Sequence, residues 1–211
     1  MGLGEWINRK RHNRGFGIQS PSSFFFITQV LKERLPYYAY PTLDKAVGGN
    51  IRKQRHFREL FRITNYLQPT GCISIESAEA AYAMSLAKPS ATHYAIAPAG
   101  TPRTQTLLAD NGCHIAASIE ELPEIISRTG TVGMLYIKAT DNIDSLVQTV
   151  LSHTNNDSII VVDGINRNKA TREWWQQIVK DNRTIVTYDM YSYGLLFFDK
   201  ERIKQHYTLK R

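Results

Sequence analysis

The chain has 211 residues, 42% of them hydrophobic, a size and composition that fit one domain with an apolar core. Charged residues make up 21%, which excludes a chain kept disordered by its charge. No apolar run approaches the roughly 18 residues that a membrane span needs. The first residues form neither a signal peptide nor a myristoylation signal, since Trp6 stands where the latter needs Ser or Thr. We therefore expect a soluble, cytoplasmic protein with no membrane partner.

The net charge of +7 is concentrated near the N-terminus. Residues 1–62 contain 12 Lys and Arg against 4 Asp and Glu, whereas the remaining residues contain 14 against 15. Such a basic segment can attract nucleic acid at low salt; a solvated basic helix face is the alternative. Cys72 and Cys113 stand far apart in apolar runs, which predicts buried free thiols, and the six histidines form no zinc-binding pattern.

The first 70 residues predict a helical cover segment. Ser20 followed by Pro21 is typical of a helix N-terminus, and apolar residues then recur at helical spacing. A turn-rich stretch over 36–41 precedes a second helical pattern over 51–67. The solvent face of this second helix is expected to carry five basic residues: Arg52, Lys53, Arg55, Arg58 and Arg62.

Residues 71–211 alternate short β-type runs with helical patterns. The runs expected to form strands are 72–76, 92–97, 132–138 and 158–163, with a short strand near 114–116. The helical patterns between them are 78–87, 102–111, 120–128, 141–153 and 169–180. This alternation predicts βαβ units and a parallel sheet buried on both faces. The last two runs, 184–188 and 194–199, have no helix between them, which predicts an antiparallel pair.

Together these patterns predict a single structural domain of the α/β class. We expect a Rossmann-like, doubly wound, mostly parallel sheet that ends in an antiparallel β-hairpin. The N-terminal helical extension, residues 1–70, would cover the core formed by residues 71–211.

Several separated segments resemble one known family. They are Arg11–Pro21, Pro36–Tyr40, Val162–Ile165 with Glu173–Trp175, and the hairpin segments Val186–Met190 and Gly194–Phe198. In this order they resemble the bacterial O-methyltransferase-like family of class I S-adenosylmethionine (SAM) methyltransferases. The resemblance implies SAM as cofactor, a small-molecule acceptor as substrate, and a substrate wall that includes Gln19, Tyr37 and Tyr38. Packing of the tyrosines over the sheet is the structural alternative.

The resemblance also places the cofactor-binding positions, where the motif is degenerate. The turn after the first strand has Glu76, Ser77 and Ala78 in place of the family's glycine-rich sequence, and each added Cβ narrows the space beside the backbone. Glu76 is the candidate contact for the SAM ammonium group, and Glu79 is expected to face the dipole of its helix. Ala97 ends the second strand, where the family has a carboxylate for the ribose hydroxyls.

Asp163 and Lys138 are the candidate catalytic residues, because each stands at the end of a predicted strand. Metal-dependent relatives place oxygen ligands in this region, but Lys138 and Gly164 replace two of them, so we expect no metal. Either Asp163 or Lys138 would help to deprotonate the acceptor. The alternatives are a turn-capping Asp163, a solvent-facing Lys138, and an ion pair between the two.

Two functions follow from these observations. The first is a divergent SAM-dependent methyltransferase, acting by O-methyl transfer to a small acceptor held in line with the methyl group. The second is a catalytically inactive protein that keeps the methyltransferase fold as a binding module for a protein or nucleic-acid partner. The glycine-free turn favours the second function, and the retained framework and cover segment favour the first.

Overall fold

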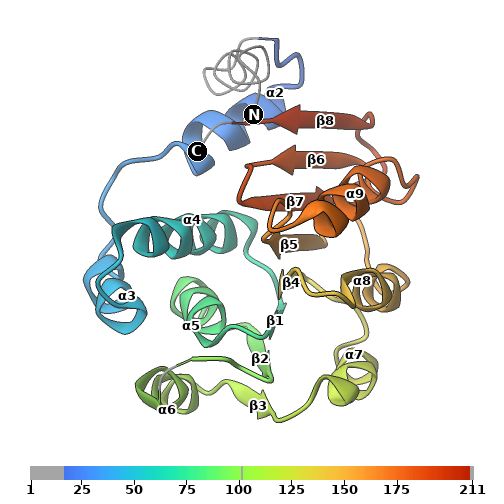
Figure 1. Cartoon of the computed structure of the whole chain (residues 1–211). Helices are drawn as coiled ribbons and strands as arrows, with labels where there is room; N and C mark the ends of the chain where they lie inside the picture. Colours follow the sequence, from blue (N-terminus) through green and yellow to red (C-terminus); the bar gives the residue numbers. More distant parts are fainter. Residues whose placement is uncertain (1–16, 101, 210–211) are drawn as a thin grey trace.

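A computed structural model describes residues 17–100 and 102–209. Its centre is one eight-stranded sheet in the order β3-β2-β1-β4-β5-β7-β6-β8. Strand β7 pairs antiparallel with both β5 and β6, and every other neighbouring pair is parallel. Helices cover both faces of the sheet (Figure 1). The predicted fold class, a doubly wound and mostly parallel α/β sheet with an antiparallel hairpin, is confirmed.

The strands lie where runs of apolar and β-branched residues predict them. Their bounds are β1 Gly71–Ile75, β2 Thr92–Ile96, β3 His114–Ala116, β4 Met134–Lys138, β5 Ile159–Asp163, β6 Val186–Asp189, β7 Tyr193–Phe197 and β8 Gln205–Thr208. In β5, residues 159–162 are all buried, because helices cover both sides of this strand. The sequence did not predict β8, since only Tyr207 of its four side chains is buried; its pairing with β6 forms it.

The helices form two layers. Their bounds are α2 Pro21–Phe25, η1 Phe26–Leu31, α3 Tyr40–Val47, α4 Ile51–Leu67, α5 Ala78–Ala87, α6 Pro102–Asp110, η2 Ile119–Glu121, α7 Leu122–Thr129, α8 Ile143–Leu151 and α9 Lys169–Ile178. Helices α4, α5 and α6 cover one face of the sheet and α7, α8 and α9 the other (Figure 1). Each helix layer packs against one face of the sheet and buries a separate apolar cluster there.

The cover segment begins as the sequence predicts and then departs from it. Ser20 caps α2, because its Oγ accepts a hydrogen bond from Ser23 N at 3.4 Å, and Pro21 is the first helical residue. The chain continues directly into the π-helical turn η1. Helix α3 was not predicted: the turn-rich stretch runs into a helix with Pro41 as its second residue, a position where proline costs no hydrogen bond.

One basic residue of α4 does not face solvent. Arg62 is buried, and its guanidinium donates hydrogen bonds to Val30 O at 2.8 Å, Leu31 O at 3.0 Å and the Tyr40 hydroxyl at 3.3 Å. The expectation of a solvent-exposed Arg62 is therefore wrong. Carbonyl groups at the end of a helix lack partners within it, and here a side chain of a different helix supplies the donors.

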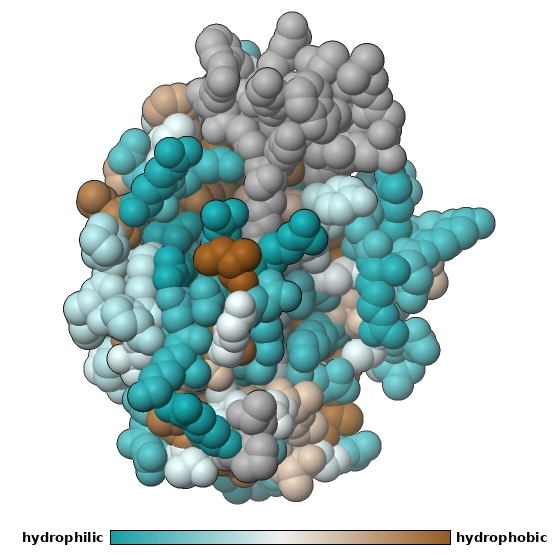
Figure 2. Space-filling model, turned by 60° about the vertical axis from the view of Figure 1, so that its left-hand side comes forward, coloured by the Kyte–Doolittle hydropathy of each residue, from teal (hydrophilic) through white to brown (hydrophobic). Residues whose placement is uncertain are grey.

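The surface that carries α3 and α4 is mostly hydrophilic, with isolated apolar residues (Figure 2). Arg52, Lys53 and Arg55 of α4 are exposed, whereas Arg58 forms an ion pair with Asp44. This internal ion pair neutralises part of the excess positive charge of the N-terminal half. Less positive charge is therefore available to attract a nucleic acid.

Both cysteines are buried free thiols, as predicted. Burial raises the pKa of Cys72 to about 12, and it also raises the pKa of Cys113. The thiols are therefore protonated and unreactive in the folded protein. Among the helices that the structure describes, none has both the length and the apolar character to cross a membrane.

Candidate functional site

Several of the predicted site residues lie at one edge of the sheet. The carboxyl ends of neighbouring parallel strands meet at the same edge, so the turns after β1 and β2 lie beside the last residues of β4 and β5. Lys138 and Asp163 are register partners at the ends of the last two strands. The predicted site residues at this carboxyl edge are Glu76, Ser77, Ala78, Ala97, Lys138 and Asp163.

The backbone at Glu76 and Ala97 has a conformation that glycine adopts more easily. The φ angle is +58° at Glu76 and +43° at Ala97, and left-handed backbone costs a residue with a side chain about 1–2 kcal/mol. Hydrogen bonds hold both turns: Glu76 N donates to Ile96 O at 3.0 Å, and Ala97 N donates to Ala116 O at 2.8 Å. The chain therefore keeps tight, glycine-like turns although neither residue is glycine.

The segment after β2 covers the N-terminus of α5. Ser77 and Ala78 have no exposed surface. Ser77 Oγ accepts a hydrogen bond from Ala80 N at 3.2 Å, and Ala78 N donates to Ala99 O at 3.1 Å. Gly100 lies so close that a Cβ at this position would stand 2.6 Å from Ala78 Cβ. The amides of Ala78 and Ala80 are thus bound within the protein, and Gly100 lies against the Ala78 side chain.

Glu79 does more than face the dipole of its helix. Its buried carboxylate accepts a hydrogen bond from Lys53 Nζ of α4 at 2.7 Å. Charge-assisted hydrogen bonds of this kind are stronger than neutral ones. This pair joins α4 to α5 next to the turn after β1, so α4 helps to close this part of the edge.

A buried polar cluster lies at the ends of β4 and β5. The Tyr136 hydroxyl donates to Asp163 Oδ2 at 3.0 Å, and His56 Nε2 of α4 lies 3.2 Å from the same hydroxyl and 3.8 Å from Asp163 Oδ1. Burial, followed by the Asp163 charge, raises the pKa of Tyr136 well above its ordinary value. The phenol therefore stays protonated and serves as a hydrogen-bond donor to Asp163.

The imidazole of His56 is packed among aromatic rings. Its centroid lies 5.1 Å from those of both Phe57 and Tyr193, and the Tyr193 hydroxyl donates to Glu59 Oε2 at 3.2 Å. Sequence reasoning missed His56 and Tyr136, because each occurs within an apolar pattern of its own element. Their contact joins positions 80 residues apart, for which the local sequence holds no signal.

The structure does not pair Lys138 with Asp163. The two are register partners, but the Asp163 carboxylate turns toward Tyr136 and His56. Within the described ranges no ion pair joins Lys138 to Asp163, so the ion pair considered from the sequence is not formed. The same ranges contain no group of three or more His, Cys, Asp or Glu side chains that could hold a metal ion.

The three residues of the predicted substrate wall are not brought together with Asp163. Gln19 lines a hollow beside Gln205, the first residue of β8, at the opposite, amino edge of the sheet. Tyr37 packs against Phe61 and donates to Glu33 Oε2 at 2.6 Å, a hydrogen bond that raises the pKa of Tyr37 to about 12. Tyr38 is 87% exposed. Their role as substrate contacts stays a prediction.

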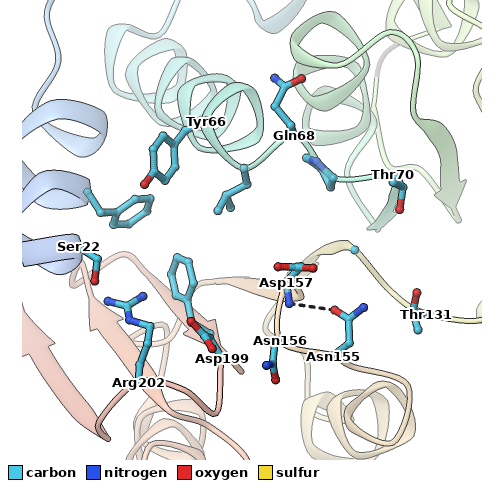
Figure 3. Close-up of a pocket in the computed structure, with 15 residues that line it drawn as sticks. Ser22, Tyr66, Gln68, Thr70, Thr131, Asn155, Asn156, Asp157, Asp199 and Arg202 are labelled. Carbon is cyan, nitrogen blue, oxygen red and sulfur yellow. Dashed lines mark hydrogen bonds between the residues drawn. The ribbon is translucent and has the colours of Figure 1, made fainter.

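A pocket of about 380 Å³ lies at the amino edge, between the α4–β1 loop and the loops that precede β5 and follow β7 (Figure 3). Some of its polar side chains have partners within the protein. Asn155 Oδ1 accepts from Asp157 N at 3.0 Å, and Arg202 donates to Ser23 Oγ at 2.7 Å. These contacts belong to turns and to the docking of α2, so the pocket is separate from the carboxyl-edge site.

The SAM that the family resemblance implies does not fit the carboxyl edge as it stands. Ala78 N donates to Ala99 O, and Gly100 lies against the Ala78 side chain. The methyl side chain of Ala97 offers no acceptor to ribose hydroxyls, and losing one hydrogen bond to a charged group costs about 1.5–3 kcal/mol. The hydrogen-bonding groups at this edge therefore differ from those that the cofactor needs.

No protein-family model matches the sequence, and no curated protein sequence matches it significantly. Solved structures do match it. A Klebsiella pneumoniae protein assigned as an O-methyltransferase is 11% identical, with 82% of this chain and 95% of that chain covered and a TM-score of 0.61.

Two further structures contain the cofactor or its product. TomG of Streptomyces achromogenes, an O-methyltransferase of tomaymycin synthesis in complex with SAM, is 13% identical over 82% of this chain and 94% of its own, with a TM-score of 0.55. The S-adenosylhomocysteine-bound methyltransferase PaMTH1 of Podospora anserina is 10% identical over 87% and 97%, with a TM-score of 0.57. Identities this low establish architecture rather than activity. The chain has the fold of the class I SAM-dependent methyltransferases.

Proposed function

We propose that this chain is a methyltransferase-fold binding protein that does not carry out SAM-dependent methyl transfer. The observation that carries the proposal is the closure of the α5 N-terminus. Ala78 N donates to Ala99 O, and Gly100 lies in contact with Ala78. A ligand seated between the ends of β1 and β2 would have to displace this segment and break that hydrogen bond.

Electrostatics at the same edge support the proposal. Glu79, at the start of α5, is neutralised by Lys53 rather than open to a cationic ligand. Ala97 supplies no carboxylate for ribose hydroxyls. A protein that relied on SAM would lose affinity at Ala97, because a missing charge-assisted hydrogen bond costs about one to two decades.

Calorimetric titration with SAM and S-adenosylhomocysteine tests the proposal. We expect no binding stronger than about 1 mM, which corresponds to about −4 kcal/mol. Cooperative thermal unfolding of the same sample confirms that the protein is folded. Saturable binding of either compound at micromolar concentration would contradict the proposal, since it would require the 97–100 segment to open readily.

A second candidate function is SAM-dependent O-methyl transfer to a small molecule. Two observations favour it: the glycine-like turns at Glu76 and Ala97 persist, and Asp163 sits at the strand end with 29% of its side chain exposed. A partly exposed carboxylate that accepts a hydrogen bond from Tyr136 would accept a proton from a hydroxyl placed within hydrogen-bond reach.

Methyl transfer from labelled SAM to a panel of phenols and hydroxy compounds separates the two candidates. Under the first, wild type and Asp163→Asn both give only background. Under the second, wild type transfers label and Asp163→Asn is slower by about 10²-fold or more, the usual contribution of a general base. Transfer that Asp163→Asn leaves unchanged would remove Asp163 from the reaction.

A further inference from the structure

The amino-edge pocket combines an excess of negative charge with an apolar wall. We propose that it binds a small organic amine, with the ammonium group beside Asp157 and the apolar part of the ligand against the aromatic rings of the pocket. The inference goes beyond the proposed function, because it concerns the opposite edge of the sheet from the carboxyl-edge site. It holds whether or not SAM binds there.

The charged side chains that line the pocket are two carboxylates and one guanidinium, those of Asp157, Asp199 and Arg202. In the ranges that the structure describes, neither carboxylate forms an ion pair. The Arg202 guanidinium instead donates to the buried Ser23 Oγ at 2.7 Å, and Figure 3 shows it apart from Asp157. One negative charge is therefore in excess, and Asp157 is the carboxylate to which a cationic group of a ligand has access.

The ends of helices add to this negative potential. A helix that leads into a strand ends near the amino end of that strand, and three such helices end beside the pocket. Helix α4 ends at Leu67, which lines the pocket, while α7 and α8 end shortly before the lining residues Thr131 and Asn155. The C-terminus of a helix carries a partial negative charge that a nearby cation stabilises. The last turns of α4 and α8 contain no basic residue, so they do not supply this cation themselves.

The apolar wall belongs to the same pocket. Its apolar lining residues are Phe26, Leu67, Pro69 and Phe197. The rings of Phe26 and Phe197 meet edge to face with their centroids 5.3 Å apart, and the Tyr66 centroid lies 5.8 Å from that of Phe26. Tyr66 is 45% exposed, so part of its surface is open to a ligand. A volume of about 380 Å³ lies within the range of small-molecule sites.

An ammonium group attached to an aromatic ring uses both features of the pocket. The ring gains by leaving water for the apolar wall, and the ammonium group is attracted by the Asp157 carboxylate and by the faces of aromatic rings. A metal ion would leave the apolar wall without a partner. An anionic ligand would be repelled by the two carboxylates.

Titration with 2-phenylethylamine, followed by backbone amide shifts in nitrogen-15 NMR spectra, tests the proposal. We expect saturable shifts centred on 66–70 and 155–158, with a millimolar dissociation constant. Two compounds of similar shape separate the contributions: 2-phenylethanol lacks the charge, and 3-phenylpropionate reverses it. Each should bind at least about fivefold more weakly than the amine, because each loses the attraction to Asp157.

Matched variants locate the two parts of the ligand. Asp157→Asn should weaken binding of the amine at least about fivefold and leave binding of 2-phenylethanol unchanged, whereas Asp141→Asn, at the carboxyl edge, should change neither. Tyr66→Ala should weaken both compounds, and Tyr38→Ala should weaken neither. All four side chains are exposed, so the variants are expected to fold.

Three results would overturn the inference. They are the absence of saturable shifts in the pocket, equal affinity of wild type and Asp157→Asn for the amine, and binding of 2-phenylethanol as tight as that of the amine. The calorimetric titration with SAM decides the proposed function separately, so either proposal can fail while the other stands.

Discussion

Replacing Gly194 by alanine is expected to destabilise the protein by about 3 kcal/mol or more, at the upper end for overpacking a core. Gly194 lies in β7, hydrogen-bonded on one side to β5 and on the other to β6. A Cβ there would come within 2.6 Å of three ring carbons of Trp175. The indole is buried, 3% exposed, so a Cβ at position 194 would force this rigid ring between α9 and the sheet to shift. Urea-induced unfolding measures the loss.

Gly71→Ala is the matched control for this substitution. Gly71 likewise lies in a strand of the same sheet, but a Cβ at that position meets no atom within 4 Å. Its free energy of unfolding should stay within about 0.5 kcal/mol of wild type. Adding Trp175→Leu to Gly194→Ala should recover part of the lost stability, since the smaller side chain removes the clash. Equal stability of Gly71→Ala and Gly194→Ala would show that the packing is not as tight as described.

The second large effect is expected for Arg62→Met, which should lose about 2–4 kcal/mol of stability. Methionine retains the length of the side chain but removes the donors to Val30 O and Leu31 O. Each buried carbonyl left without a partner costs about 1–3 kcal/mol. Because those carbonyls end η1, we also expect faster hydrogen exchange in 21–31, where α2 and η1 would detach from α4.

Arg55→Met, on the same helix, controls for the loss of one positive charge. Arg55 is exposed, so its replacement should change the free energy of unfolding by no more than about 0.5 kcal/mol. If Arg62→Met and Arg55→Met unfold at the same denaturant concentration, the hydrogen bonds of Arg62 contribute nothing to stability.

Local sequence patterns predicted most of the architecture. Runs such as Ile159–Val162 must be buried on both faces, and alternation with helical patterns then requires crossovers and parallel pairing. The absence of a helix between 184–188 and 194–199 predicted the antiparallel pair correctly. Ser20 and Pro21 marked the start of α2 because capping depends on adjacent residues.

The missed elements depend on contacts between distant parts of the chain. Strand β8 buries one side chain and exists through its pairing with β6. Arg62 was assigned to solvent from its place in a basic pattern, whereas carbonyls more than 30 residues away bind it. Lys53 and Glu79, 26 residues apart, form the pair that joins α4 to α5.

The same distinction, between what local sequence predicts and what distant contacts decide, applies to the candidate site. The sequence by itself determined which side chains stand at the strand ends. They are Glu76 instead of a glycine, Ala97 instead of a carboxylate, Lys138 and Asp163. Only the tertiary structure decided that the segment at Ala99 closes over α5 and that Asp163 turns from Lys138 toward Tyr136 and His56. The physical reason is that residue type limits which bonds a position can make, whereas the choice among them depends on partners that folding brings from other elements.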